Sequence, residues 1–274
     1  MKIFQNIFCA IAVATIAPIS AYAATITVKG SDTMVILTQR WAEAFMKKYP
    51  EHKVQVTGGG SGTGIAALQN GTTDIATSSR PMKPAENDKI RAQTQAPATE
   101  TAVAKDGVTF YVNSKNGVSA LTIEQLRAIY EGDITNWKQV GGKDETLVLY
   151  SRENSSGTYV FVKDHLLNGG DFAANAQTLA GTAAVVNAIA KEPRDIGYNG
   201  AAYAKGIKEL KVQVGNNAIE ASAENVKSGK YPLSRDLFFY TRHKPSSDLQ
   251  RFLDFCLSPE GQAIVTTVGY YPLK

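Results

Sequence analysis

The sequence predicts an α/β protein folded into two lobes, and three observations support this. Strand-like and helix-like patterns alternate from residue 25 onward, an order typical of a mainly parallel sheet with helices on both faces. The composition, with 43% hydrophobic and 20% charged residues, excludes disordered and collagen-like chains. Two hydrophobic runs, near 104–112 and 231–240, can join one lobe to the other.

The first 23 residues have the features of a secretory signal peptide. Lys2 is the only charged residue among them, Ile7 to Ile19 is mostly apolar, and Ala21-Tyr22-Ala23 has the small-x-small form that signal peptidase cuts. The apolar stretch is too short for a membrane helix, which needs roughly 18 residues. We therefore expect an exported, soluble protein of the periplasm.

The two cysteines exclude a disulfide framework. Cys9 lies in the leader and lacks the small preceding residue that lipid attachment requires, so we expect no lipoprotein. Cys256 is then alone and, on an apolar helical face, is expected in the core. The net charge is +4, and lysine and arginine are dispersed, which argues against a nucleic-acid partner. We expect a monomer.

The first predicted helix shows the clearest periodicity. Leu37, Trp41, Ala44 and Phe45 follow the i, i+4, i+7, i+8 spacing of one helical face. A shorter helix ends at Gly71, a natural C-cap. In chain order the expected elements are strand 25–29, helix 33–49, strand 54–57, helix 65–70 and strand 74–76.

The run VAKDGVTFYVN, residues 103–113, is interrupted by Asp106-Gly107. It fits either a hairpin or one long strand crossing between lobes. Thr122 and Gln125 form a capping box for the next helix, which Gly132 ends. The elements expected after it are strand 147–150, helices 159–167 and 183–190, strands 195–198 and 231–241, and a tail helix carrying Leu249, Phe252, Leu253 and Cys256.

These predictions divide the chain into three parts. Residues 1–23 form the signal peptide, 24–104 plus 241–274 form lobe I, and 105–240 form lobe II including the hinge strands.

Three segments share one design, in which a strand end is followed by Ser, Thr and Gly and then by a helix. They are GSDTM at 30–34, GGGSGTG at 58–64 and SRENSSGT at 151–158. Helix N-termini attract anions, hydroxyls donate to them, and glycine lets the backbone approach closely. One such segment alone is ordinary capping. Three of them, with the turn Ser78-Ser79-Arg80, favour convergence on one anion.

Three charged residues belong to these segments, and each has an alternative. The planar fork of Arg152 matches an oxyanion bidentately, but Arg152 can also be a surface arginine paired with Glu153. Arg80 can bind the anion or form a structural ion pair. Asp32 can cap a helix, which is the simpler interpretation, or accept a proton from a protonated ligand.

The sequence does not match the enzyme motifs that its Gly-rich turn and its histidines bring into question. Thr63 stands where the nucleophile elbow needs its last glycine, and the Gly-rich turn contains no Walker lysine. His52, His165 and His243 lack metal-ligand spacing. We expect no enzyme activity, no cofactor and no metal.

The motifs together resemble a known family, the periplasmic phosphate-binding proteins that feed ABC phosphate importers. The resemblance covers essentially the whole chain after the leader. It rests on GSDTM, the G-x-GS-x-G loop, TTDIATSSRPM, LTIEQLRAIYEGDITNWKQVGG, R-x-x-x-SGT, AVVNAIAKEPRDIGYNG, YPLSRDLFFYT and SPEGQAIVTTVGYYPL. The R-x-x-x-SGT spacing, Arg152 with Ser156-Gly157-Thr158, is the most specific of these.

The resemblance implies a type II periplasmic-binding-protein fold, with two α/β lobes joined by a two-strand hinge and closing on a dehydrated oxyanion. The expected function is capture of inorganic phosphate and its delivery to the membrane permease of an ABC importer. Alternatives are another oxyanion such as sulfate or molybdate, and a secreted phosphatase. The candidate phosphate-binding residues are Ser31, Asp32, Thr33, Ser61, Ser79, Arg80, Arg152, Ser156, Gly157 and Thr158.

One position departs from the best-known members of that family. They carry an aspartate after the third strand to accept the proton of the ligand, whereas here the matching residue is Ser79, followed by Arg80. A hydroxyl can still accept from a ligand O–H, but it does not repel a fully ionised anion. Asp32 and Ser79 are the nearest candidates for the acceptor, and the sequence alone favours Asp32.

Overall fold

The structure is a computed structural model that describes residues 25–204, 206–242 and 244–273. The predicted signal peptide, 1–23, lies outside these residues. Within the described ranges, no helix combines the length and apolar character that a bilayer span requires.

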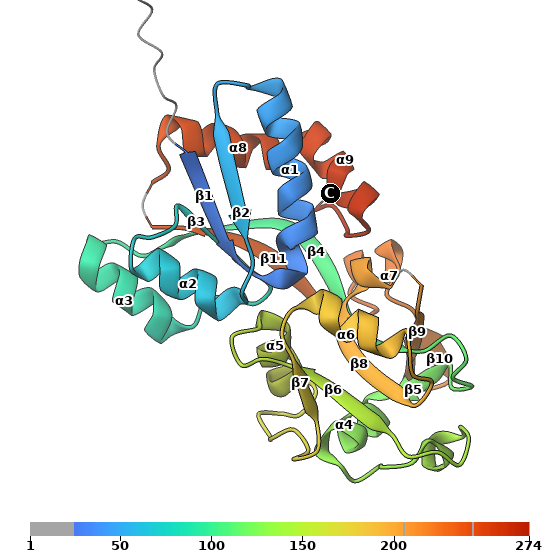
Figure 1. The fold of residues 1–274 in the computed structure, drawn as a ribbon. Coiled ribbons are helices and arrows are strands. Elements are labelled where there is room, and N and C mark those ends of the chain that lie inside the picture. The colour runs from blue at the N-terminus through green and yellow to red at the C-terminus, as the bar shows by residue number, and fades with distance from the viewer. Residues whose placement is uncertain (1–24, 205, 243, 274) are drawn as a thin grey trace, which may run out of the picture.

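The first lobe is built on a parallel arrangement in which β1 lies between β2 and β3 (Figure 1). Trp41 and Phe45 on α1 are fully buried, as the helical spacing predicts. The Trp41 indole donates to the carbonyl of Gly261 at 2.8 Å, which ties α1 to α9. The elements of this lobe are β1 (Thr25–Gly30), the 3-10 helix η1 (Asp32–Met34), α1 (Val35–Lys48), β2 (Lys53–Thr57), α2 (Ser61–Gln69), β3 (Ile75–Ser78), α3 (Pro84–Thr94), α8 (Ser247–Leu257) and α9 (Pro259–Val268).

Two long antiparallel strands connect the lobes, β4 (Thr99–Val112) and β11 (Ser234–Thr241). β11 also pairs with β3, and the last residues of β4 pair with β8 and β9. β4 is therefore shared by the sheets of both lobes, and Figure 1 shows both strands running toward the junction. Of the two interpretations of the run at Asp106-Gly107, the single long strand is correct.

The second lobe continues the sheet from β4 through β8 and β6 to β7, with β9 branching toward β5 and β10. Its elements are β5 (Ala120–Thr122), α4 (Ile123–Glu131), η2 (Trp137–Val140), β6 (Val148–Arg152), α5 (Gly157–His165), β7 (Gln177–Leu179), α6 (Thr182–Ile189), β8 (Asp195–Gly200), η3 (Ala201–Tyr203), β9 (Lys208–Val214), β10 (Asn217–Ile219) and α7 (Ala223–Lys227).

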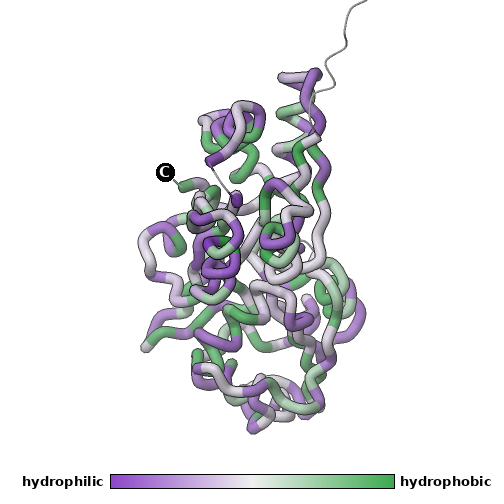
Figure 2. The backbone as a smooth tube through the Cα atoms, turned by 90° about the vertical axis from the view of Figure 1, so that its left-hand side faces the viewer, coloured by the Kyte–Doolittle hydropathy of each residue, from purple (hydrophilic) through white to green (hydrophobic). Residues whose placement is uncertain are grey.

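Each lobe has its own large hydrophobic core. Trp41 and Phe239 belong to the core of the first lobe, and Trp137 and Phe110 to that of the second. Hydrophobic stretches accordingly occur in both halves of the chain trace (Figure 2). Cys256 is completely buried in the first core, as expected.

Local signals in the sequence were mostly reliable. Thr122 accepts from the N–H of Gln125 at 3.1 Å, and α4 ends at Gly132, so the capping-box prediction is confirmed. The expectation of a mainly parallel sheet is correct for β1 to β3 and for β6 to β8. It is wrong for the centre of the sheet, because the returning strand β11 runs antiparallel to both of its neighbours.

Candidate functional site

The three Ser/Thr/Gly segments meet between the lobes. Thr33, after β1, lies across from Thr158 on α5, with their hydroxyl oxygens 3.0 Å apart. The N–H of Gly62 donates to the carbonyl of Ser155 at 2.8 Å, so the second segment also touches the third. The convergence expected from the sequence is therefore present in the fold.

The centre of this meeting point is a group of buried hydroxyls, which we call the hydroxyl cluster: Thr33, Ser61, Ser79 and Thr158. Ser79 donates its N–H to Ser61 Oγ at 3.1 Å, and the two Oγ atoms are 3.4 Å apart. Each side chain belongs to a residue at most 1% exposed. Hydroxyls both donate and accept, so the cluster can surround a group rich in oxygen atoms.

Two further predicted residues lie at the edges of the same loops. The hydroxyl of Ser156 caps α5 by accepting from the N–H of Tyr159 at 3.3 Å. Ser31 is buried and donates its N–H to the carbonyl of Thr77 at 3.0 Å. Both hold the loop backbone in place.

Gly157 lies close against the first lobe. A Cβ atom there would lie 2.3 Å from Ser61 Oγ and 2.6 Å from Ser79 Oγ. Only glycine allows α5 to begin this near the first lobe. The N-terminus of α5 therefore faces the hydroxyl cluster.

Arg152 is the charged centre of the site and is 1% exposed. Its guanidinium donates to Glu153 at 2.9 and 3.1 Å, to Thr182 and Asn199 at 2.9 and 3.0 Å, and to Asp32 at 3.1 Å. The pairing with Glu153 was one sequence interpretation, but the surface location that went with it is wrong. Burial alone would raise the pKa of Glu153, yet the bond from Arg152 holds it below its ordinary value.

Asp32 does not cap a helix through its side chain. η1 has Ser31 at its N-cap and no side-chain cap bond. Asp32 Oδ1 instead accepts from the N–H of Gly59 at 2.8 Å, and Oδ2 accepts from Arg152. The capping interpretation is therefore wrong, because the carboxylate links two segments of the first lobe to the arginine of the second.

Arg80 is not brought into the hydroxyl cluster by its guanidinium. Nη1 and Nη2 donate to the two carboxylate oxygens of Glu86 at 2.8 and 2.7 Å, and Nη1 also donates to the carbonyl of Pro81. Burial opposes ionisation of Glu86, but the bonds from Arg80 hold the pKa of Glu86 below its usual value. Arg80 therefore has the structural role considered from the sequence, although its ion pair lies within the first lobe and does not join the two lobes.

Sequence reasoning missed Arg235 and Asp106 at this site. Arg235 Nη2 donates to Thr158 Oγ1 at 3.1 Å and to Asp106 at 2.7 Å. A signal was present, because each is a charged residue within a hydrophobic strand run. Their partnership was hidden, since 129 residues separate them in the sequence.

Metal ligation finds no support in the described part of the chain. No group of three or more His, Cys, Asp and Glu side chains there is arranged to hold an ion. The site offers hydroxyls, helix N–H groups and guanidinium donors, which suit an oxyanion better than a cation.

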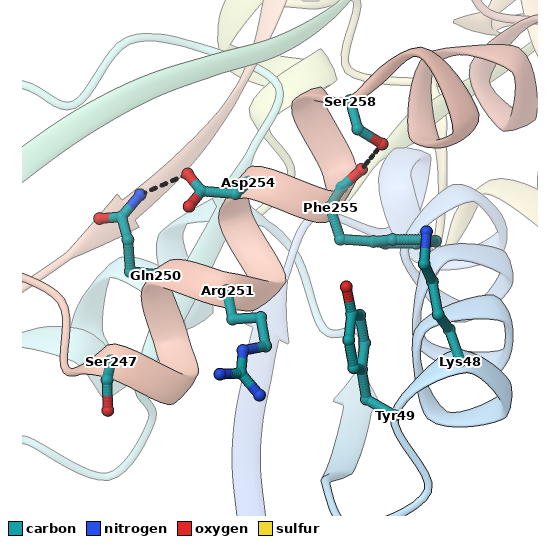
Figure 3. A pocket seen from close by; sticks show the side chains of 8 residues that line it. All are labelled: Lys48, Tyr49, Ser247, Gln250, Arg251, Asp254, Phe255 and Ser258. Carbon is teal, nitrogen blue, oxygen red and sulfur yellow. Dashed lines mark hydrogen bonds between the residues drawn. The ribbon is translucent and has the colours of Figure 1, made fainter.

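A separate hollow of about 490 Å³ lies between α1 and α8 (Figure 3). Lys48 and Arg251 each lie over the ring of Tyr49, at 6.0 and 5.6 Å from its centroid. Their charges are matched by Glu260 and Glu51. The hollow is open and its cations are paired, so it lacks the buried donors found at the hydroxyl cluster.

Comparison with known proteins agrees with this geometry. The PBP superfamily domain matches residues 15–260. The phosphate-binding protein PstS of Pseudomonas aeruginosa is 32% identical over 89% of this chain and 81% of its own length, and that of Bacillus subtilis is 32% identical over 91% and 81%. The chain belongs to the PstS family of phosphate-binding proteins.

Solved structures extend this family relationship to three dimensions. A protein of Clostridium perfringens, described as a phosphate ABC transporter substrate-binding protein and solved with bound phosphate, matches 92% of this chain and 100% of its own. Its TM-score is 0.84 and its identity 29%. An ABC-type phosphate transport receptor of Vibrio cholerae matches 90% of this chain and 99% of its own, with a TM-score of 0.72 and 28% identity. The two-lobe fold with its two-strand hinge is the fold of this family.

Proposed function

We propose that this chain is a substrate-binding protein that captures inorganic phosphate between its lobes and delivers it to an ABC importer. The observation that carries the proposal is the hydroxyl cluster, buried where three loop-to-helix segments meet beside Arg152. A tetrahedral oxyanion accepts hydrogen bonds in many directions, and this arrangement supplies donors from both lobes. The phosphate-binding relatives support the choice of anion.

The proposed ligand contacts fall into two groups. The first lobe contributes the loop at Ser31, Asp32 and Thr33, with Ser61 and Ser79. The second contributes Arg152 with Ser156, Gly157 and Thr158. Of the residues considered from the sequence, we leave Arg80 out of the proposed contacts, because Glu86 holds its Nη1 and Nη2 on the first lobe and none of its hydrogen bonds reaches the hydroxyl cluster.

Entry of the anion requires the lobes to separate. Thr33, Ser61 and Thr158 are at most 1% exposed, and contacts across the junction close over them. The two strands β4 and β11 are the hinge about which the lobes part, as in other binding proteins that close around ligand. Lobe I is 24–104 plus 241–274, and lobe II is 105–240 including the hinge strands.

The remaining properties are proposed from the sequence. Export depends on a signal peptide at 1–23 without lipid attachment, and the protein acts in the periplasm as a monomer with a membrane permease as partner. Binding makes and breaks no covalent bond, so neither a nucleophile nor a cofactor is required.

A competition series tests the proposal. Ligand is first removed by unfolding and refolding, and phosphate, arsenate, sulfate and molybdate are then titrated calorimetrically. Phosphate should bind most tightly. Tighter binding of sulfate or molybdate would assign the site to that anion, and release of phosphate from a monoester without added metal would favour a phosphatase.

A further inference from the structure

Arg235 and Asp106 face each other on the two hinge strands. They are register partners of β11 and β4, and Arg235 donates from Nε and Nη2 to Asp106 Oδ2 at 3.0 and 2.7 Å. Their side chains are 3% and 0% exposed. Asp106 also accepts from the N–H of Ala201 at 3.2 Å, so the pair is fixed against the second lobe.

The guanidinium of Arg235 extends from this pair to the first turns of α5. Nη2 reaches Thr158 Oγ1 at 3.1 Å, and the guanidinium carbon lies 5.4 Å from the ring centroid of Phe161. Because arginine only donates, Thr158 Oγ1 is the acceptor in this bond. The hydroxyl hydrogen of Thr158 is therefore left to donate onward into the hydroxyl cluster.

The donors of Arg235 are not all used within the protein. Nε and Nη2 are bonded, but Nη1 is buried and has no hydrogen-bond partner among the described residues. Buried donors without partners cost free energy, and such groups are uncommon in native structures. Nη1 belongs to the same rigid fork that touches Thr158, which places an unused donor next to the site.

We propose that Arg235 is a second arginine of the anion site. Nη1 donates to the bound oxyanion, and Nη2 fixes the hydroxyl of Thr158 as a donor to it. The inference rests on the proposed function. Asp106 neutralises the added charge, so Arg235 contributes directed hydrogen bonds more than net attraction.

The test removes the pair as a unit, since loss of Arg235 alone would leave a buried uncompensated carboxylate. The variant is Arg235→Met with Asp106→Asn, in which Asn keeps an acceptor for Ala201. The matched control is Lys105→Met with Asp236→Asn. That neighbouring pair joins the same two strands at 2.8 Å and is about one-third exposed.

Phosphate affinity is measured by calorimetry on protein freed of ligand. We expect the Kd to rise by about tenfold or more in the Arg235 variant, and to stay within about twofold in the control. Equal affinities of the two variants would overturn the proposal. Absence of phosphate binding by the unmodified chain would instead refute the proposed function.

A double-mutant cycle separates positioning from general stability. Thr158→Val should cost much less affinity when Arg235 and Asp106 are already neutral, because the orientation of the hydroxyl is then lost. If the losses of phosphate affinity caused by Thr158→Val and by the Arg235/Asp106 variant simply multiply, the positioning role is overturned. If the neutral pair fails to fold, Arg235→Lys decides, since lysine keeps the ion pair but lacks the fork. Wild-type affinity of that variant would overturn the proposal.

Discussion

Nη2 of Arg152 in the second lobe lies 3.1 Å from Oδ2 of Asp32 in the first. The same nitrogen lies 2.9 Å from Glu153, so two carboxylates share one buried guanidinium. The local net charge is therefore not positive, although the site faces an anion. Affinity should come mainly from oriented hydroxyl and backbone donors, because all five N–H groups of Arg152 bond to protein acceptors in this structure.

Replacing Arg152 should nevertheless be costly. Arg152→Ala leaves the partly buried carboxylates of Asp32 and Glu153 without their partner and removes the guanidinium that we propose as an anion contact. We expect phosphate binding to weaken by about 2–5 kcal/mol while the fold is retained.

Calorimetric titration measures this loss, and Arg194→Ala is the control. Arg194 is an exposed arginine whose side chain pairs with Glu192 at 3.3 Å, so its loss should leave binding unchanged. A loss below about 1.4 kcal/mol at Arg152, which is tenfold in Kd, would mean that the guanidinium does not touch the anion.

The sequence allowed the three anion loops and the hinge runs to be predicted, because each combines local signals within a few residues. Prediction failed for elements with a mostly polar surface and for residue pairs whose members are far apart in the sequence. α3 was not predicted, since Ile90 is its only buried residue and its helical face is weakly apolar. Because Glu86 lies on α3, the partner of Arg80 was missed with it. The pairing of Arg235 with Asp106 depends on strand register, which local patterns do not encode.

Gly157 should control closure of the lobes. Gly157→Ala would place a methyl group against Ser61 and Ser79, which lie 2.3 and 2.6 Å from the Cβ position. Phosphate affinity should fall by about tenfold or more, because the loops must move apart.

Small-angle scattering checks the cause of this effect. Saturating phosphate should reduce the radius of gyration of the ligand-free wild type but not that of Gly157→Ala. Gly117→Ala is the control, because its Cβ position has nothing within 4 Å. If the wild type does not become more compact, closure about β4 and β11 is not part of binding.

Asp195 gives the stability of the protein a defined pH dependence. Burial raises the pKa of this carboxyl to about 6, and its Oδ1 has no hydrogen-bond partner in the described residues. Between pH about 4 and 6 the unfolded chain has lost this proton while the folded chain keeps it, so rising pH favours unfolding there. Above that window the loss of stability from this group no longer grows.

Asp195→Asn should therefore stabilise the protein above pH 6, by about 1–2 kcal/mol. At this chain length, that is a rise in Tm of a few degrees. The advantage should disappear near pH 4. Thermal unfolding from pH 4 to 8 measures it, with the exposed Asp164→Asn as control. A stabilisation that does not depend on pH would show that burial of the charged carboxyl is not its cause.

We predict that Ser79 rather than Asp32 accepts the proton of a phosphate ligand, the opposite order to the one expected from the sequence. Both oxygens of Asp32 are engaged, one by Gly59 and the other by Arg152. Ser79 is completely buried, and its Oγ lies 3.4 Å from that of Ser61 within the hydroxyl cluster. A hydroxyl there can accept from the O–H of phosphate, which sulfate lacks.

Removing that acceptor should lower selectivity more than affinity. Ser79→Ala is expected to reduce the difference between the phosphate and sulfate binding free energies by about 1–3 kcal/mol, which is the cost of an unmet hydrogen-bonding group. The ratio of phosphate to sulfate affinity falls accordingly. Ser79→Asp should raise the ratio, because a carboxylate accepts the same proton and repels the fully ionised anion. Asp32→Asn should affect both anions alike, since it acts through Arg152. Titrations of both anions at one pH give the three ratios. If Ser79→Ala leaves its ratio unchanged while Asp32→Asn lowers it, the acceptor is the carboxylate of Asp32 and Arg152 must release it when phosphate binds.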